Sequence, residues 1–188
     1  MEFRTFDIEG PFELTPRKFE DERGYFSETF RLAQFIDRAG PVEFVQDNQS
    51  LSARTGTIRG IHFQTDPHPQ GKLVRCVAGS VFDVAVDLRR DSPTYGRWVS
   101  VILSADALNQ LWIPVGFGHA FCTLEPNSVI TYRTTDYYSP EHDKGVAWDD
   151  ADIGIDWPEV ADAATLSGKD RAQPALADLP ALFSVKGH

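Results

Sequence analysis

Alternating apolar and polar positions recur through the middle of the chain, in short runs separated by glycine and proline. The stretch "KLVRCVAGSVFDVAVDLR" (72–89) holds two such runs joined by a short glycine link, which is typical of a β-hairpin. Many short strands with little helix between them predict an all-β fold, and their even spacing favours a jelly-roll barrel. Further strand-like runs are "GRWVSVIL" (96–103), "QLWIP" (110–114), "HAFCTL" (119–124) and "SVITYRTTDYY" (128–138).

Helical periodicity is confined to two segments, so only a few short helices are expected. "SETFRLAQFIDRAG" (27–40) begins at a possible N-cap, Ser27, and ends at Gly40, whereas "DAATLSGKDRA" (162–172) predicts a short C-terminal helix. From about residue 149 the sequence becomes irregular and acidic. We therefore expect one domain over residues 1–188, with a barrel core at about 19–148 and a tail at about 149–188 that wraps the barrel.

The charge balance narrows the range of partners. The 188 residues include 28 acidic and 18 basic side chains, a formal net charge of −10 that would repel nucleic acid or an anionic membrane. No signal-peptide pattern and no apolar run long enough for a membrane helix are present, so a cytoplasmic protein is expected. Cys76 and Cys122 lie within apolar runs, which predicts small core residues rather than a disulfide.

Histidines on a predicted jelly roll raise the question of a metal site. Metal-binding jelly rolls typically supply a His-x-His pair and a downstream glutamate, because a metal needs three or four converging ligands. In this sequence His62 is followed by Phe63 and Gln64, while His68 and His119 stand alone. We therefore expect no metal.

Six motifs in a fixed order resemble one family, the dTDP-4-dehydrorhamnose 3,5-epimerases, which are metal-free cupins. The resemblance runs from about Phe19 to Asp170 and implies a cupin-type jelly-roll barrel, a dTDP-4-keto-6-deoxy sugar as substrate and no cofactor. The motifs are "FEDERGYFSETF", "QDNQSLSARTGTIRGIHFQ", "KLVRCVAGSVFDVAVDLRRDSPTYGRW", "IPVGFGHAF", "YRTTDYYSP" and "WDDADIGIDWP".

The implied reaction defines the groups that the site must contain. A 4-keto sugar has acidified C–H bonds at C3 and C5, so inversion needs a base, a group that stabilises the enolate oxygen, and an acid on the opposite face. The resemblance makes His62 the base, oriented by Asp170, and Tyr132 the acid. It directs Lys72 at the C4 oxygen, with Asp83 on the neighbouring hairpin strand holding the ammonium group. Without the resemblance, the histidine and the tyrosine would be taken for core residues and the lysine for a solvated strand end.

Nucleotide recognition follows from the same resemblance. It assigns Arg23 and Arg59 to the phosphates, because a guanidinium fork suits phosphate oxygens. Strict alternation puts Arg59 and His62 on opposite faces of one strand, so both reach the pocket only if the strand bulges or twists, for example at Gly60. The remaining expected substrate contacts are Glu28, Gln46 and Asn48, the aromatic surfaces of Phe19 and Tyr138, and His119 near the sugar.

Two alternatives stay open at this point. The family includes enzymes that invert only C3, and a silent sugar-nucleotide-binding cupin is a further possibility, although a pure binder needs no base facing an acid. The strand-like segment before Phe19 and the open edges of a jelly roll favour a homodimer, which the resemblance also implies.

Overall fold

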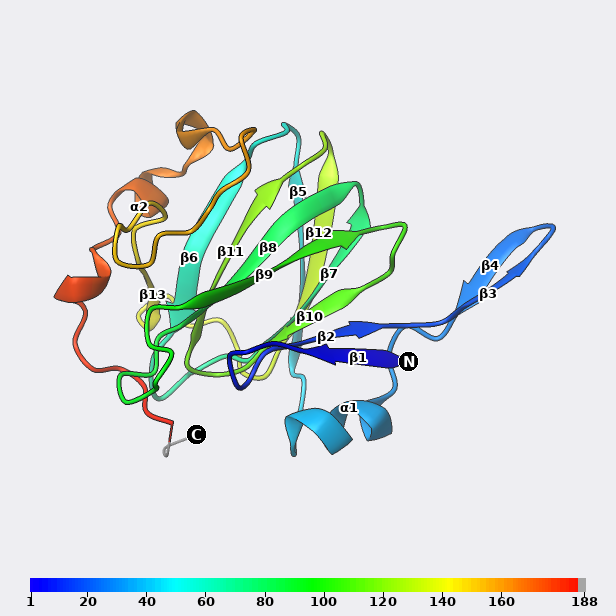
Figure 1. Cartoon of the computed structure of the whole chain (residues 1–188), viewed down its shortest axis with the longest axis horizontal. Helices are drawn as coiled ribbons and strands as arrows, with labels where there is room; N and C mark the ends of the chain where they lie inside the picture. The colour runs from blue at the N-terminus through cyan, green and yellow to red at the C-terminus, as the bar shows by residue number, and fades with distance from the viewer. Residues whose placement is uncertain (186–188) are drawn as a thin grey trace.

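Two antiparallel sheets packed face to face form the body of the computed structural model, which describes residues 1–185 (Figure 1). The all-β, jelly-roll prediction is confirmed. The first sheet has the order β1 (Glu2–Thr5), β2 (Phe12–Thr15), β10 (Gln110–Ile113), β7 (Lys72–Ala78), β12 (Ser128–Thr134), β5 (Gln46–Ser52). The second sheet has the order β13 (Asp143–Gly145), β6 (Ile58–Gln64), β11 (Phe117–Thr123), β8 (Ser80–Asp87), β9 (Trp98–Ser104).

The space between the sheets is filled by apolar side chains from both of them. Val74 and Ile130 from the six-stranded sheet meet Ala85 and Phe121 from the five-stranded sheet in one buried cluster. Cys76 lies in this cluster, and both cysteines are buried and free, as predicted. Removing such side chains from water stabilises the barrel and holds both sheets at a fixed separation.

Apolar side chains also pack against part of the outer face of each sheet. Helix α1 (Leu32–Ala39) packs on the six-stranded sheet, where Phe35 is fully buried against Phe12 and Trp112. The C-terminal tail crosses the outside of the five-stranded sheet (Figure 1) and buries side chains such as Phe183 against Phe63. Its short helical turns are η1 (Ala163–Thr165), α2 (Gly168–Arg171) and η2 (Leu176–Asp178).

Both predicted helices differ from the observed ones, the first in where it begins and the second in its continuity. Helix α1 ends at Gly40 as predicted, with φ at +79°, but it begins five residues after Ser27, which belongs to strand β4 and pairs with Lys18. The C-terminal segment forms two separate turns rather than one helix, because the Ser167 side chain accepts a hydrogen bond from the Asp170 N–H and starts α2 anew.

The predicted hairpin of residues 72–89 is wrong. Strand β7 pairs with β10 and β12, whereas β8 pairs with β9 and β11 in the facing sheet. The glycine link at Gly79, with φ at +71°, therefore passes from one sheet to the other. Val74 and Cys76 of β7 meet Val81 and Ala85 of β8 in the buried cluster between the sheets, so the two strands pack face to face rather than edge to edge.

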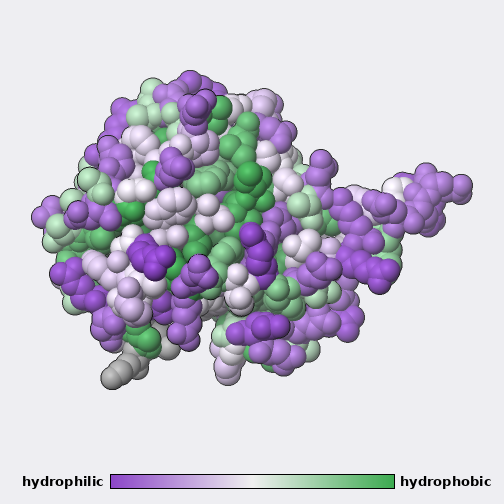
Figure 2. Space-filling view, viewed as in Figure 1, coloured by the Kyte–Doolittle hydropathy of each residue, from purple (hydrophilic) through white to green (hydrophobic). Residues whose placement is uncertain are grey.

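A two-stranded arm, β3 (Lys18–Asp21) and β4 (Gly24–Ser27), projects from the barrel (Figure 1). The space-filling view shows it standing clear of the body with a hydrophilic tip (Figure 2). Phe19 is 52% exposed and Phe26 is 71% exposed, although both are large apolar side chains. A lone hairpin is marginally stable in water, so this arm needs a surface to pack on.

No helix within residues 1–185 is long and apolar enough to cross a membrane.

Candidate active site

Strand β6 contains the bulge that a shared pocket requires. His62 pairs with His119 of β11 and Arg59 pairs with Phe121, so three steps along β6 match two steps along β11. The extra residue restores the parity of Arg59 and His62, and the bulge lies at the expected place, Gly60, where φ is +122°. A side chain at Gly60 would lie 2.5 Å from the Ala120 Cβ, so glycine is required there.

The His62 ring is fixed by a buried carboxylate. Its Nε2 lies 2.6 Å from Asp170 Oδ1, and the Asp170 side chain is almost fully buried. Burial alone would raise the pKa of Asp170, but the hydrogen bond and charge of His62 hold that pKa below its usual value, so the carboxylate stays ionised. Within the described residues no hydrogen bond engages the Nδ1 atom of His62, which leaves one ring nitrogen for a ligand.

Lys72 is buried at the start of β7, beside the histidine. Its Nζ lies 3.4 Å from the backbone carbonyl of His62, and the residue is only 9% exposed. Burial lowers the pKa of Lys72 to about 8, although the charges of Asp143 and Asp83 oppose this shift. The lysine is therefore mostly charged at neutral pH and suits an anionic ligand.

The expected contact between Asp83 and Lys72 is absent from the polar contacts of the described residues. Asp83 lies on β8 in the facing sheet, and its carboxylate oxygens lie 3.0 and 3.1 Å from Nε2 of His119. Burial raises the pKa of Asp83, while the charges of His119 and Lys72 lower it. The aspartate acts on the lysine by its charge across the barrel, and its direct partner is the histidine next to His62 in the sheet.

Tyr132 reaches the same cavity from the opposite sheet. It lies on β12, and its side chain lines a cavity of about 260 Å³ together with His62 and Lys72. Burial and the nearby charge of Asp143 raise the pKa of Tyr132, so the phenol keeps its proton at neutral pH. The other residues around this cavity are Gln46, Asn48, Phe63, Gln64, Gln70, Tyr138 and Asp143.

Three of the expected nucleotide contacts lie at this cavity, and Arg59 lies beside it. Gln46 and Asn48 lie on β5 and are joined by a hydrogen bond of 2.8 Å. Tyr138 follows β12, and its hydroxyl donates to Asp143. The Arg59 guanidinium donates to the side chain of Ser52, and its charge lowers the pKa of Tyr132 against the effect of burial.

The other three residues expected to contact the nucleotide, Phe19, Arg23 and Glu28, do not lie at the cavity of their own chain. Phe19 and Arg23 lie on the projecting arm, where Arg23 forms an ion pair with Asp21. Glu28 follows the arm and pairs with Arg31 at 2.7 Å. These side chains therefore do not line the cavity that holds His62.

Sequence reasoning missed three polar residues that line the cavity, Asp143, Gln64 and Gln70, and also Lys169 next to it. Asp143 lies on β13 and forms an ion pair with Lys169, the residue before Asp170. Gln64 lies two residues past His62 on β6 and also lines the cavity. Asp143 lies in a three-residue strand and Lys169 in a four-residue helix, both too short to show periodicity, so only their place beside Tyr138 and Asp170 in the fold reveals them.

No group of three or more histidine, cysteine or carboxylate side chains in residues 1–185 could hold a metal ion. The groups present are those of acid–base chemistry: a histidine held by a carboxylate, a protonated tyrosine on the opposite wall, and a buried ammonium group. A jelly-roll barrel with this set of residues defines a cupin-type acid–base enzyme.

Comparison with known proteins identifies the family. The chain belongs to the dTDP-4-dehydrorhamnose 3,5-epimerase family, whose model matches residues 5–178. It is 53% identical over 183 residues to the dTDP-4-dehydrorhamnose 3,5-epimerase of Sinorhizobium fredii, an alignment that covers 97% of this chain and 93% of that protein. The resemblance inferred from the six motifs is thus confirmed.

Two solved structures show how far the likeness extends. The epimerase of Legionella pneumophila, in complex with dTDP-4-keto-L-rhamnose, has a TM-score of 0.90 and 41% identity, with 97% of each chain covered. A 3'-monoepimerase of Streptomyces bikiniensis, in complex with dTDP-quinovose, has a TM-score of 0.88 and 34% identity, with 96% of this chain and 92% of that chain covered. The same fold therefore serves enzymes that differ in the number of centres they invert.

Proposed function

We propose that this protein inverts both C3 and C5 of dTDP-4-dehydro-6-deoxyglucose and so forms dTDP-4-dehydrorhamnose. One observation carries the proposal: His62, which is held by Asp170, and Tyr132 line one cavity from opposite sheets, with Lys72 beside the histidine. An inversion needs a base on one face of the sugar and an acid on the other, and two facing walls supply that arrangement.

The proposed mechanism has the same two steps at each carbon. His62 removes the proton next to the C4 carbonyl, and the ionised Asp170 stabilises the imidazolium that forms. The electron pair moves to the C4 oxygen, where the Lys72 ammonium stabilises the enolate. Tyr132 then donates its phenolic proton to the carbon from the opposite face, and solvent restores the protonation of both groups.

The nucleotide would occupy the part of the cavity near β5. Gln46 and Asn48 offer amide groups there, Tyr138 is 55% exposed and offers an aromatic face for the base, and Arg59 lies close to Tyr132 for the phosphates. His119 lies behind His62 on the neighbouring strand and would support the sugar side of the pocket together with Asp83.

Inversion of C3 alone is the second candidate, because the structure of a monoepimerase superimposes closely on this chain. The double inversion is preferred, since the more similar relative is named a 3,5-epimerase. A non-catalytic binder would have no use for a base and an acid on facing walls of one cavity.

Deuterium exchange separates these functions. The protein is incubated with dTDP-4-keto-6-deoxyglucose in deuterated water, and the labelled carbons are counted by NMR. We expect label at C3 and C5, and none with His62→Asn, which should still bind dTDP through the nucleotide contacts. Label at C3 alone would identify a monoepimerase, and no label would indicate a binding protein.

The working unit is proposed to be a homodimer in the cytoplasm. The arm carries Phe19, Arg23 and the exposed Phe26, yet it projects away from the cavity of its own chain (Figures 1 and 2). A second copy of the chain would give the arm an apolar surface and would receive Phe19 and Arg23 near its nucleotide. The two free, buried cysteines suit a reducing compartment.

A further inference from the structure

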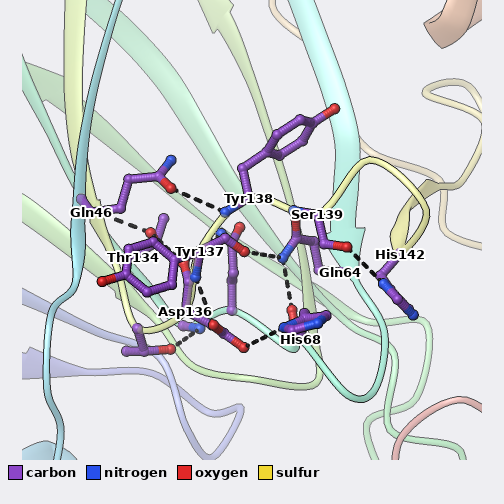
Figure 3. A network of polar contacts seen from close by, with 12 residues as sticks. Gln46, Gln64, His68, Thr134, Asp136, Tyr137, Tyr138, Ser139 and His142 are labelled. Atoms are coloured by element: carbon purple, nitrogen blue, oxygen red, sulfur yellow. Dashed lines mark hydrogen bonds and ion pairs between the residues drawn. The ribbon is translucent and has the colours of Figure 1, made fainter.

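Both the nitrogen and the oxygen of the Gln64 side-chain amide form hydrogen bonds with backbone groups of two loops. The residue is 3% exposed and lies on β6, two positions past His62 and therefore on the same face of the strand. Its Nε2 donates to the carbonyls of His68 at 2.7 Å and Tyr137 at 3.1 Å, and its Oε1 accepts from the Ser139 N–H at 2.8 Å (Figure 3).

Two of these three bonds are to the residues immediately before and after Tyr138. The N–H of Tyr138 itself donates to Gln46 Oε1 at 3.0 Å, so the backbone of three consecutive residues is held by two glutamines on two sheets (Figure 3). The Tyr138 side chain, by contrast, is 55% exposed and has one hydrogen bond, from its hydroxyl to Asp143. The direction of its ring is therefore set mainly by its backbone.

Other side chains also form hydrogen bonds with the loop that carries Tyr138, but none of these side chains lies on β6. The His68 ring bonds to the Asp136 carboxylate and the Ser139 hydroxyl bonds to the His142 ring (Figure 3). The Gln70 side chain donates to the Asp136 carbonyl. Gln64 alone among these bonds both neighbours of Tyr138, and it also bonds the loop that leads into Lys72.

We propose that Gln64 is a positioning residue that fixes the Tyr138 ring as a preformed surface for the nucleotide base, and so determines nucleotide affinity without taking part in proton transfer. A ring held in its binding orientation loses little conformational freedom when the ligand arrives, and this increases affinity. The strand that carries the proposed base His62 thereby also positions the nucleotide. This inference rests on the proposed function.

The test is a double-mutant cycle on dTDP binding, measured by calorimetry. Gln64→Met keeps the volume of the side chain and removes all three hydrogen bonds, and should weaken dTDP binding roughly 10-fold. Tyr138→Leu should weaken it roughly 10-fold or more, because it removes a base–aromatic stack. If Gln64 acts through Tyr138, the double variant should bind dTDP about as weakly as Tyr138→Leu alone.

Steady-state kinetics give a second test, because a purely structural role for Gln64 would not change KM while leaving kcat unchanged. Gln64→Met should raise KM about as much as it weakens dTDP binding, while kcat for deuterium exchange stays within roughly 3-fold of wild type. Gln64→Glu is the isosteric variant: its carboxylate accepts from Ser139 but cannot donate to Tyr137 or His68. It should therefore fail to restore affinity, and it replaces Gln64→Met if that variant does not fold.

Asn109→Leu is the matched control, since Asn109 is equally buried and its amide also makes three hydrogen bonds, at the turn between β9 and β10. It should lower the melting temperature and leave dTDP affinity unchanged. Additive effects in the cycle, or wild-type affinity in both Gln64 variants of an otherwise active enzyme, would overturn this inference alone. A wild-type protein that does not bind dTDP would overturn the proposed function as well.

Discussion

Burial and neighbouring groups together set the protonation states of three residues at the site. Asp170 stays ionised because it is bonded to His62, whereas Tyr132 stays protonated because burial and Asp143 raise its pKa. Burial lowers the pKa of Lys72 to about 8, so its ammonium group is charged at neutral pH but close to losing its proton. These three states are the ones that an enolate mechanism needs at the start of a turnover.

Tyr132→Phe tests the acid, because it removes one hydroxyl and almost no volume. His62 can still remove and return protons in this variant, so exchange with solvent should persist while inversion falls by about 10² to 10⁴. NMR in deuterated water measures both rates on one sample, and the losses at C3 and C5 should be unequal. Inversion of both centres at the wild-type rate would show that another group is the acid.

Lys72 should make stability depend on pH in a defined window. Its pKa falls from 10.5 to about 8 on folding, so the unfolded chain binds more protons between these values and the free energy of unfolding rises with pH there. Below pH 8 the buried charge costs on the order of 3 kcal/mol, at about 1.36 kcal/mol per pKa unit. Lys72→Met should be more stable than wild type at pH 7 and should lose that advantage by about pH 10.5.

Urea unfolding at a series of pH values measures this difference. Comparing the variant with wild type at each pH cancels the titration of all other groups. A stability difference that does not change between pH 7 and pH 10.5 would contradict the buried, charged lysine. The same variant should show no deuterium exchange at either carbon, because the enolate on the route to both inversions is no longer stabilised.

At the scale of elements, the bulge in β6 decides which side chains reach the cavity. Periodicity located this strand correctly, and parity alone would have sent Arg59 and His62 to opposite faces. The same periodicity suggested a hairpin for β7 and β8, which lie in facing sheets. A glycine link is compatible with both arrangements, so strand pairing is decided by which side chains pack together rather than by the link.

Gly60→Ala tests the bulge. The new Cβ would meet Ala120 Cβ at 2.5 Å and the His119 carbonyl at 2.6 Å, at a φ of +122°. We expect a loss of at least about 2 kcal/mol, which for a chain of this size lowers the melting temperature by roughly 5–10 °C, together with slower exchange as His62 shifts. Calorimetry and NMR measure the two effects.

Gly40→Ala is the control for that variant. Gly40 also has a positive φ, +79°, but nothing lies within 4 Å of a Cβ built there. It should cost only about 1 kcal/mol and leave exchange unchanged, since it removes a helix-terminating glycine far from the cavity. Equal losses of stability in the two variants would show that the close approach of Gly60 to β11 is not the cause of the loss.

At the scale of the whole molecule, part of the outer face of each sheet is covered, and the arm is not packed against either sheet. Helix α1 packs on β2 and β10 of one sheet and the C-terminal tail packs on the other, and the tail also brings Asp170 to His62. The arm leaves Phe19 and Phe26 exposed. If arms are exchanged between two copies, each active site is complete only in the dimer.

Mixed dimers test this exchange. His62→Asn keeps an intact arm, and Arg23→Ala keeps an intact cavity. Each variant alone should be nearly inactive at low substrate concentration. When the two are unfolded and refolded together, about a quarter of the wild-type activity should return, because half of the dimers then hold one complete site. No recovery, or a monomer in sedimentation, would contradict the exchange.

The sequence by itself determined the class of fold, the positions of most strands and the groups able to do acid–base chemistry. These follow from local periodicity and from motifs, since alternation over a few residues already shows that a strand is half-buried. The His62, Lys72 and Tyr132 motifs needed no knowledge of distances. Their roles, the enolate mechanism and the nucleotide-linked sugar came from the resemblance of six motifs to one family, since local patterning alone would have made them core residues and a solvated strand end.

Only the tertiary structure decided which of these residues meet. The pairing of Asp170 with His62 was expected from the resemblance and is confirmed, but Asp83 bonds His119 rather than Lys72. Gln64 and Asp143 bond to Tyr137 and Tyr138, which lie in a loop without a periodic pattern, so the sequence did not reveal these contacts. The physical reason is that pairing, crossing and loop contacts depend on the summed burial of distant segments, whereas a sequence pattern reports only the environment of each segment on its own.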